Sequence, residues 1–175
     1  MMEKSGMCEP GVSTRVLLTA FCGTSAEKLI RGTDDYTNLY LPNDRQKDSE
    51  KLIHSLSQKT FDLVISFGQK PNVKNKVYIE TTAHEGGNYI FTNADYKKMK
   101  DCFTKNGLFP IISNNAGTSF CNCLYLNGLK YIFQNNMNTK MIFVHIPFLK
   151  NISDFIEFKN MIFSSLAEFT KEEAR

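Results

Sequence analysis

The sequence predicts a three-layer α/β/α domain built on a mostly parallel, twisted sheet. Short apolar runs rich in β-branched and aromatic residues alternate with longer segments in which apolar residues recur every three or four positions. Strands that alternate with helices favour a parallel sheet covered on both faces. At 175 residues the chain has room for one domain with a full-sized core.

Each expected element rests on its own apolar pattern. The runs typical of buried strands cover residues 15–20, 61–67, 108–113 and 141–146. The segments typical of helices cover residues 43–59, 93–106, 118–135 and 153–171. In the first of these segments, Leu52, Ile53 and Leu56 show the helical spacing.

Two segments fall outside this alternation. Residues 76–92 contain the runs VYIE and NYIF on either side of an HEGG turn, which predicts a short antiparallel hairpin or an excursion at the edge of the sheet. Residues 1–13 are expected to form a loose tail, which leaves 14–175 as a single domain. No linker divides that domain.

Composition and charge exclude several classes of protein. Hydrophobic residues make up 42% of the chain and charged residues 22%, which excludes disordered and coiled-coil proteins. The longest apolar runs fall far below the ~18 residues of a spanning helix, and no signal core stands at the N-terminus, so we expect a cytoplasmic protein without membrane association. The net charge is only +3, so nucleic acid is not an expected partner. Five cysteines without regular spacing indicate free thiols.

Cys121 is the candidate nucleophile. Ligands bind beyond the carboxyl ends of parallel strands, and the third expected strand leads into the AGT turn that precedes Cys121. If Thr118 caps the following helix, Cys121 lies in the first turn, where free N–H groups and the helix dipole lower a thiol pKa. A buried, inert thiol explains the position equally well. Cys123, about 200° further round the helix, is expected to pack in the core.

His145 is the candidate base, because the fourth expected strand carries it to the same edge of the sheet. A lone histidine in an apolar strand is more often a hydrogen-bonded core residue, but a thiol nucleophile needs an imidazole within reach to take its proton. The carboxylate that would orient this imidazole is Glu80 or Glu85, and the residue pattern leaves both open. His84 and Glu80 would share a face only on a helix, so no metal site is expected.

Four stretches, FGQ, YIE, AGTSFCN and FVHIPFL, make the chain resemble pyroglutamyl peptidase I, the pyrrolidone-carboxylate peptidases. In that family an AGT-x-x-CN segment carries the nucleophilic cysteine, an H-x-P-x-L strand carries the histidine, and an I-E-R-x-A segment carries the acid. The resemblance therefore implies that Cys121, His145 and Glu80 are the catalytic residues. It also implies a phosphorylase/hydrolase-like fold and no cofactor.

The function implied by the resemblance is that of a cysteine peptidase. Such an enzyme releases N-terminal pyroglutamate from peptides through an acyl-enzyme, with His145 acting first as base and then as acid. Phe21 and Gln69 match family residues that surround the lactam. Related peptidases associate, so the resemblance is compatible with a homo-oligomer.

The chain also departs from the family pattern. The loop AFCGTSAEK lacks the family's PFGG, and KPNVKN replaces A-G-G-R, so that arginine has no counterpart. The segment after Glu80 is shorter than usual. These changes leave two alternatives open: a thiol amidase for a different acyl or cyclic-amide substrate, and a catalytically silent binding homologue.

Overall fold

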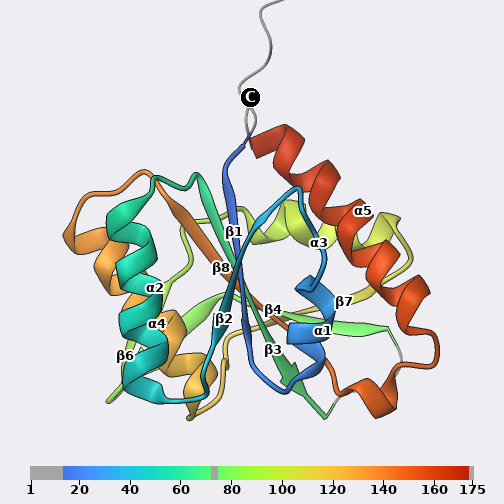
Figure 1. Ribbon diagram of the computed structural model, residues 1–175, viewed down its shortest axis with the longest axis horizontal. Helices are drawn as coiled ribbons and strands as arrows, with labels where there is room; N and C mark the ends of the chain where they lie inside the picture. The colour runs from blue at the N-terminus through green and yellow to red at the C-terminus, as the bar shows by residue number, and fades with distance from the viewer. Residues whose placement is uncertain (1–13, 72–74, 174–175) are drawn as a thin grey trace, which may run out of the picture.

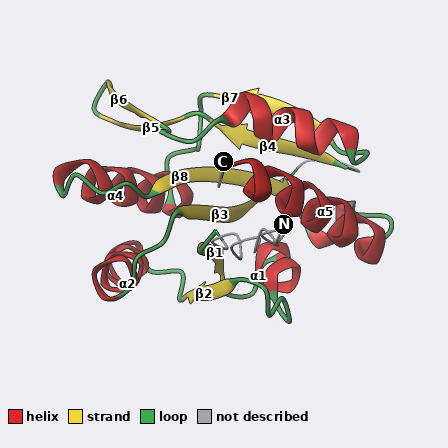
Figure 2. Cartoon of the chain, turned by 90° about the horizontal axis from the view of Figure 1, so that it is seen from above, coloured by secondary structure: helices red, strands yellow, loops and turns green. Residues whose placement is uncertain are grey.

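A six-stranded sheet forms the middle layer of the molecule (Figures 1 and 2). The structure, a computed structural model, describes residues 14–71 and 75–173. The sheet has the order β2-β1-β3-β8-β4-β7. Its strands are β1 (Val16–Phe21), β2 (Thr37–Leu41), β3 (Leu63–Lys70), β4 (Lys76–Glu80), β7 (Phe109–Ser113) and β8 (Lys140–Pro147). All neighbouring strands are parallel except β4 and β8, so the predicted three-layer, mostly parallel fold is confirmed.

Helices cover both faces of the sheet, with α2 and α4 on one side and α1, α3 and α5 on the other (Figure 1). The helices are α1 (Ser25–Ile30), α2 (Arg45–Gln58), α3 (Tyr96–Lys105), α4 (Phe120–Gln134) and α5 (Phe155–Glu173). A short 3₁₀ helix, Leu149–Asn151, precedes α5. The four predicted helices are thereby confirmed to within three residues at each end.

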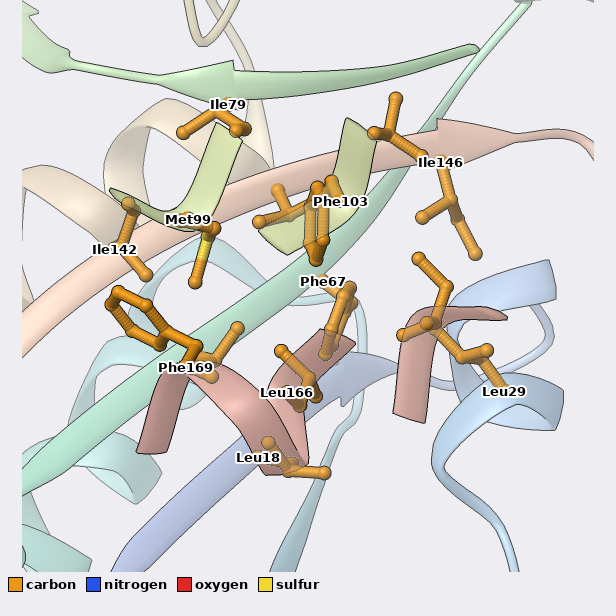
Figure 3. Packing of buried hydrophobic residues seen from close by; sticks show 14 of the residues in the cluster. Leu18, Leu29, Phe67, Ile79, Met99, Phe103, Ile142, Ile146, Leu166 and Phe169 are labelled. Atoms are coloured by element: carbon orange, nitrogen blue, oxygen red, sulfur yellow. The ribbon is translucent and has the colours of Figure 1, made fainter. Parts of the chain in front are cut away.

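The core consists of two apolar clusters, one on each face of the sheet. Leu18, Phe67 and Ile142 point into the cluster beneath α1, α3 and α5, which Figure 3 shows together with Phe103 and Leu166. Their neighbours along the strands, including Leu17 and Phe143, point into the cluster beneath α2 and α4. Successive strand residues face opposite sides, so a sheet covered on both faces needs continuous apolar runs. That requirement explains why the four strand runs stood out in the sequence.

Strand β2 and helix α1 were not predicted from the sequence. Strand β2 lies at an edge of the sheet and is mostly half-buried, so its TNLYL stretch carries no continuous apolar run. Helix α1 has only six residues, too few for a repeated apolar pattern to be recognised, although Thr24 caps it by accepting a hydrogen bond from the Glu27 N–H.

The predicted hairpin is wrong in its first arm. The VYIE run forms β4 inside the main sheet, whereas the hairpin consists of β5 (Thr82–Glu85) and β6 (Asn88–Phe91), joined at Gly86 and Gly87. Val77, Ile79 and Glu80 are buried, and β4 pairs with a strand on each side, so these residues belong to a central strand. The turn and the NYIF arm are as predicted.

The predicted tail, residues 1–13, lies outside the described residues. None of the helices in residues 14–71 and 75–173 combines the length and the apolar composition that a membrane span requires.

Candidate active site

A buried histidine and a buried carboxylate form the centre of the candidate site. His145 on β8 and Glu80 at the end of β4 are 2% and 0% exposed, and the distance from His145 Nδ1 to Glu80 Oε1 is 2.7 Å. The two strands are antiparallel neighbours, with Tyr78 opposite His145 and Glu80 opposite Phe143. Residues paired in this way share a face of the sheet, so the Glu80 side chain reaches diagonally to the imidazole.

The electrostatics of this pair place the charge on the carboxylate. Burial by itself raises the pKa of Glu80, but the hydrogen bonds from His145 and Lys70, together with the nearby Ser113 hydroxyl, outweigh it and leave that pKa below its usual value. Burial also lowers the pKa of His145, against the raising effect of Glu80, while the Lys70 charge lowers it further. At neutral pH the site therefore holds a carboxylate beside a neutral imidazole.

This charge state fixes the role of each ring nitrogen. An ionised carboxylate only accepts hydrogen bonds, so we assign the imidazole proton to Nδ1, which donates to Glu80 Oε1. Nε2 then carries a lone pair that can accept a proton. The second carboxylate oxygen, Oε2, is buried and makes no hydrogen bond of good geometry to the described residues, although the Ser113 hydroxyl lies close enough to favour the ionised form.

Cys121 faces the sheet at the position next to His145. A Cβ atom added to Gly68 on β3 would lie 2.8 Å from the Cys121 sulfur and 2.9 Å from the Phe143 ring. Gly68 is the residue paired with His145 between β3 and β8. The Phe143 ring contacts both His145 and Tyr125 of α4, with ring centroids 4.9 and 5.7 Å apart. The sulfur and the imidazole thus lie on the same face of the sheet, beneath α4.

The expected route to this arrangement was only partly right. Ser119 occupies the N-cap position of α4 in place of Thr118 and makes no side-chain cap hydrogen bond, but Cys121 still lies in the first turn. The third expected strand, β7, runs parallel to β4 and therefore opposite to β8, so its carboxyl end is not at the edge where β1, β3 and β8 end. The segment that follows β7 leads back across the sheet to α4, whose Cys121 lies beside Gly68.

The thiol pKa is raised rather than lowered, which overturns the expectation from the helix dipole. Burial raises the pKa of Cys121 to about 12, the charges of Glu80 and Asp48 raise it too, and Lys70 and the Cys121 N–H lower it. The side chain packs against the sheet instead of pointing into solvent at the helix end, so desolvation outweighs the dipole. The resting site holds a neutral thiol.

The other predicted residues are placed as follows. Phe21 is buried in the cluster beneath α2 and α4, on the face that carries Cys121. The Gln69 side chain is not brought to the thiol, because its Oε1 accepts hydrogen bonds from the Ser25 N–H and hydroxyl, both at 3.1 Å. Cys123 is half-buried, with its sulfur 3.9 Å from the Arg45 carbonyl oxygen, and not a core residue as expected.

The structure decides between the two candidate carboxylates. Glu85 is exposed and pairs with Lys130 at 2.6 Å, so Glu80 is the partner of the imidazole. His84 on β5 contributes backbone groups only to a pair of hydrogen bonds with the Asn122 side chain, at 2.9 and 2.8 Å. Among the residues that the structure describes, no three His, Cys, Asp or Glu side chains gather as a metal site would require.

Three residues of the site were missed from the sequence. Lys70 donates to Glu80 Oε1 at 2.5 Å, and the Tyr125 hydroxyl donates to the Glu80 carbonyl oxygen at 3.0 Å. Asn122, next to Cys121, fixes the β5–β6 hairpin to α4 through its two bonds to His84. The asparagine of the CN motif was the only signal among these, since a lone lysine or tyrosine has no distinguishing pattern.

The fold is that of an α/β protein, and its candidate site groups a thiol, an imidazole and a carboxylate, as thiol hydrolases do. Comparison with solved structures gives TM-scores of 0.77 with a mutant pyrrolidone carboxyl peptidase from Pyrococcus furiosus and 0.76 with pyroglutamyl peptidase I from Bacillus amyloliquefaciens. These alignments cover 91% and 93% of this chain and 99% and 97% of the solved chains, at 18% and 17% identity, and they show a shared fold.

Sequence comparison identifies the family. The family model described as pyroglutamyl peptidase matches residues 70–160, just over half of the chain. The pyrrolidone-carboxylate peptidase of Brachyspira hyodysenteriae is 31% identical over 132 residues, and that of Fusobacterium nucleatum is 27% identical over 140. The matches cover 63% and 67% of this chain, and 66% and 65% of those relatives. The chain belongs to the pyroglutamyl peptidase family, and it spans just under two thirds of the length of these two relatives.

Proposed function

We propose that this protein is a cysteine peptidase that releases N-terminal pyroglutamate from peptides. The observation that carries the proposal is the buried His145–Glu80 pair, whose free ring nitrogen lies on the face of the sheet where the Cys121 sulfur packs. A thiol, a neutral imidazole and an orienting carboxylate are the parts that acyl transfer by a cysteine nucleophile requires. We further propose that residues 14–175 form one domain that works in the cytoplasm, where its free thiols persist.

The first half of the reaction follows from the protonation states. As the Cys121 sulfur attacks the carbonyl carbon, its proton passes to His145 Nε2, because a thiol with a raised pKa is not ionised beforehand. Glu80 stabilises the imidazolium that forms. The tetrahedral oxyanion accepts hydrogen bonds from N–H groups in the first turn of α4, which have no partners within the helix. His145 then gives its proton to the leaving amine, and the acyl group stays on the sulfur.

The second half repeats this chemistry with water. His145 takes a proton from a water molecule that attacks the thioester carbonyl, and the collapse of the intermediate breaks the carbon–sulfur bond. The proton on His145 returns to the Cys121 sulfur, and pyroglutamate leaves. In this scheme Phe21 supplies apolar surface on the correct face, while Gln69, held by Ser25, anchors the start of α1.

The direct test is hydrolysis of pyroglutamyl-aminomethylcoumarin compared with acetyl- and prolyl-aminomethylcoumarin. We expect fluorescence release from the pyroglutamyl amide and little from the other two. Release from another acyl amide but not from pyroglutamate would instead establish a thiol amidase of different specificity. Failure to hydrolyse any member of a broad panel of amides would establish a catalytically silent protein.

Gly68 allows a test of how closely the sulfur must be placed. An alanine Cβ at this position would come within 2.8 Å of the Cys121 sulfur and 2.9 Å of the Phe143 ring, so the sulfur has to move. Misplacing a reacting group by about 1 Å lowers rates about 100-fold, so Gly68→Ala should reduce kcat/KM for the pyroglutamyl substrate by about that factor. A steady-state assay, with thermal unfolding to verify the fold, measures this. Undiminished turnover in a folded Gly68→Ala variant would contradict the placement of the sulfur.

A further inference from the structure

Lys70 joins three parts of the site that lie far apart in the sequence. It is the last residue of β3, and its Nζ donates to Glu80 Oε1 at 2.5 Å and to the Asn115 carbonyl oxygen at 2.9 Å. The same atom lies 5.0 Å from the centroid of the Tyr78 ring. One ammonium group therefore links the end of β3 to β4 and to the segment that leads into α4.

A solvated surface ion pair does not account for these contacts. Exposed pairs contribute little to stability and hold no fixed geometry. Here the carboxylate partner is fully buried, and the Lys70 side chain is only 24% exposed. The bond to Asn115 goes to a neutral carbonyl oxygen, which an ordinary charge pair does not require. Lys70 is thus held in one place by groups from two different segments.

The charged groups around the thiol come from three elements. Glu80 on β4 and Asp48 on α2 disfavour a thiolate at Cys121, and both raise its pKa. Lys70 on β3 acts in the opposite sense on the same thiol. The fourth titratable neighbour, His145 on β8, is neutral at pH 7 because burial and Lys70 lower its pKa. Lys70 therefore opposes two negative charges at the moment when sulfur becomes negative.

We propose that Lys70 is a positioning residue of this site: its ammonium group holds the Glu80 carboxylate against His145, fixes the Asn115 segment ahead of α4, and favours negative charge on the Cys121 sulfur. The inference rests on the proposed thiol chemistry. During attack, the proton leaves the thiol for His145, and negative charge develops on the sulfur before it passes to the carbonyl oxygen. The Lys70 charge favours that negative sulfur, while its Nζ stays bonded to the Glu80 carboxylate. Its fixed charge compensates for both without any rearrangement.

The test compares Lys70→Met, which removes charge and donors, with Lys70→Arg, which keeps the charge. Lys100→Met, at an exposed position on α3, is the matched control. The readout is the rate of Cys121 alkylation by iodoacetamide from about pH 6 to 10, followed by mass spectrometry, because only the thiolate reacts. We expect Lys70→Met to slow alkylation at least about tenfold at neutral pH, which corresponds to one pKa unit, and to move the profile to higher pH. Lys70→Arg and Lys100→Met should stay close to the parent protein.

Alkylation does not require turnover, so it separates this inference from the proposed function. A parent protein without peptidase activity that still shows the Lys70→Met shift would refute the function and support the role of Lys70. If the parent protein is active and the alkylation profile of Lys70→Met coincides with the parent profile, the role of Lys70 is refuted. Should Lys70→Met fail to fold, Lys70→Gln keeps a hydrogen-bond donor while removing the charge, and an unshifted profile in that variant overturns the inference in the same way.

Discussion

Replacing Cys121 by serine should reduce hydrolysis of pyroglutamyl-aminomethylcoumarin at least about a thousandfold. When catalytic residues act together, loss of the nucleophile alone removes most of the rate enhancement that they provide. A serine hydroxyl has nearly the size of the thiol but is a much weaker nucleophile without further activation. The half-buried site beside Gly68 accommodates either atom, so the fold should not change. Steady-state kinetics with active-site titration by an alkylating agent measures the loss.

Cys123→Ser provides the matched control for this experiment. Cys123 lies two residues further along α4 and directs its sulfur toward the Arg45 carbonyl oxygen, away from the sheet face that carries His145. Its replacement should leave kcat/KM close to the parent value, because the Cys123 sulfur contacts the Arg45 carbonyl oxygen and does not belong to the group formed by Cys121, His145 and Glu80. Turnover that survives in Cys121→Ser but falls in Cys123→Ser would transfer the nucleophile to the other cysteine.

The fold could be predicted wherever burial on both faces of the sheet demanded continuous apolar runs. The strand around Val64 and the strand around Phe143 are fully buried, and their positions followed directly from their composition. Strand direction has no such signature, because the same residues pack equally well whichever way the chain runs. For that reason the reversal of β4 and β7 relative to β8 was missed, and VYIE was assigned to a hairpin.

The site could be predicted in its chemistry but not in its electrostatics. The motifs around Cys121 and His145 indicated a thiol and an imidazole at one place, and the structure brings them to adjacent positions. The helix-start argument for a lowered thiol pKa counted local N–H groups and omitted the sheet against which the sulfur packs. Desolvation depends on tertiary packing, so it cannot be read from spacing. Lys70 was missed for the same reason: it lies in KPNVKN, where no pattern points toward Glu80.

Replacing Glu80 by glutamine should lower kcat/KM about 10⁴-fold, which is the effect of the corresponding acid-to-amide change in a serine protease triad. The carboxylate accepts from His145 Nδ1 and from Lys70 Nζ through the same oxygen, Oε1. A glutamine can present its NH₂ group to the imidazole, which would favour the tautomer with the proton on Nε2 and leave no lone pair on that nitrogen to accept the thiol proton. The imidazolium formed during attack would also lose its counter-ion.

The stability of the Glu80→Gln variant should fall as well, by ~1–3 kcal/mol, because the buried partners of the carboxylate lose a charged acceptor. Thermal or urea unfolding measures this change. Glu85→Gln is the matched control, since Glu85 is exposed and pairs with Lys130 at the surface, where such pairs contribute about 0–1 kcal/mol. Equal losses of activity in both variants would show that Glu80 has no special part in the site.

The pH dependence distinguishes orientation from simple loss of fold. His145 has a pKa below its usual value, so the proposed activity of the parent protein should persist at pH 7 and be lost as the pH falls and the imidazole becomes protonated. Glu80 raises the pKa of His145. The residual activity of Glu80→Gln should therefore have the acid limb of its kcat/KM profile at lower pH than the parent protein. In a variant that was only less folded, the maximum of kcat/KM would fall while the acid limb stayed at the same pH. An unshifted limb in well-folded Glu80→Gln would mean that the carboxylate does not act on His145.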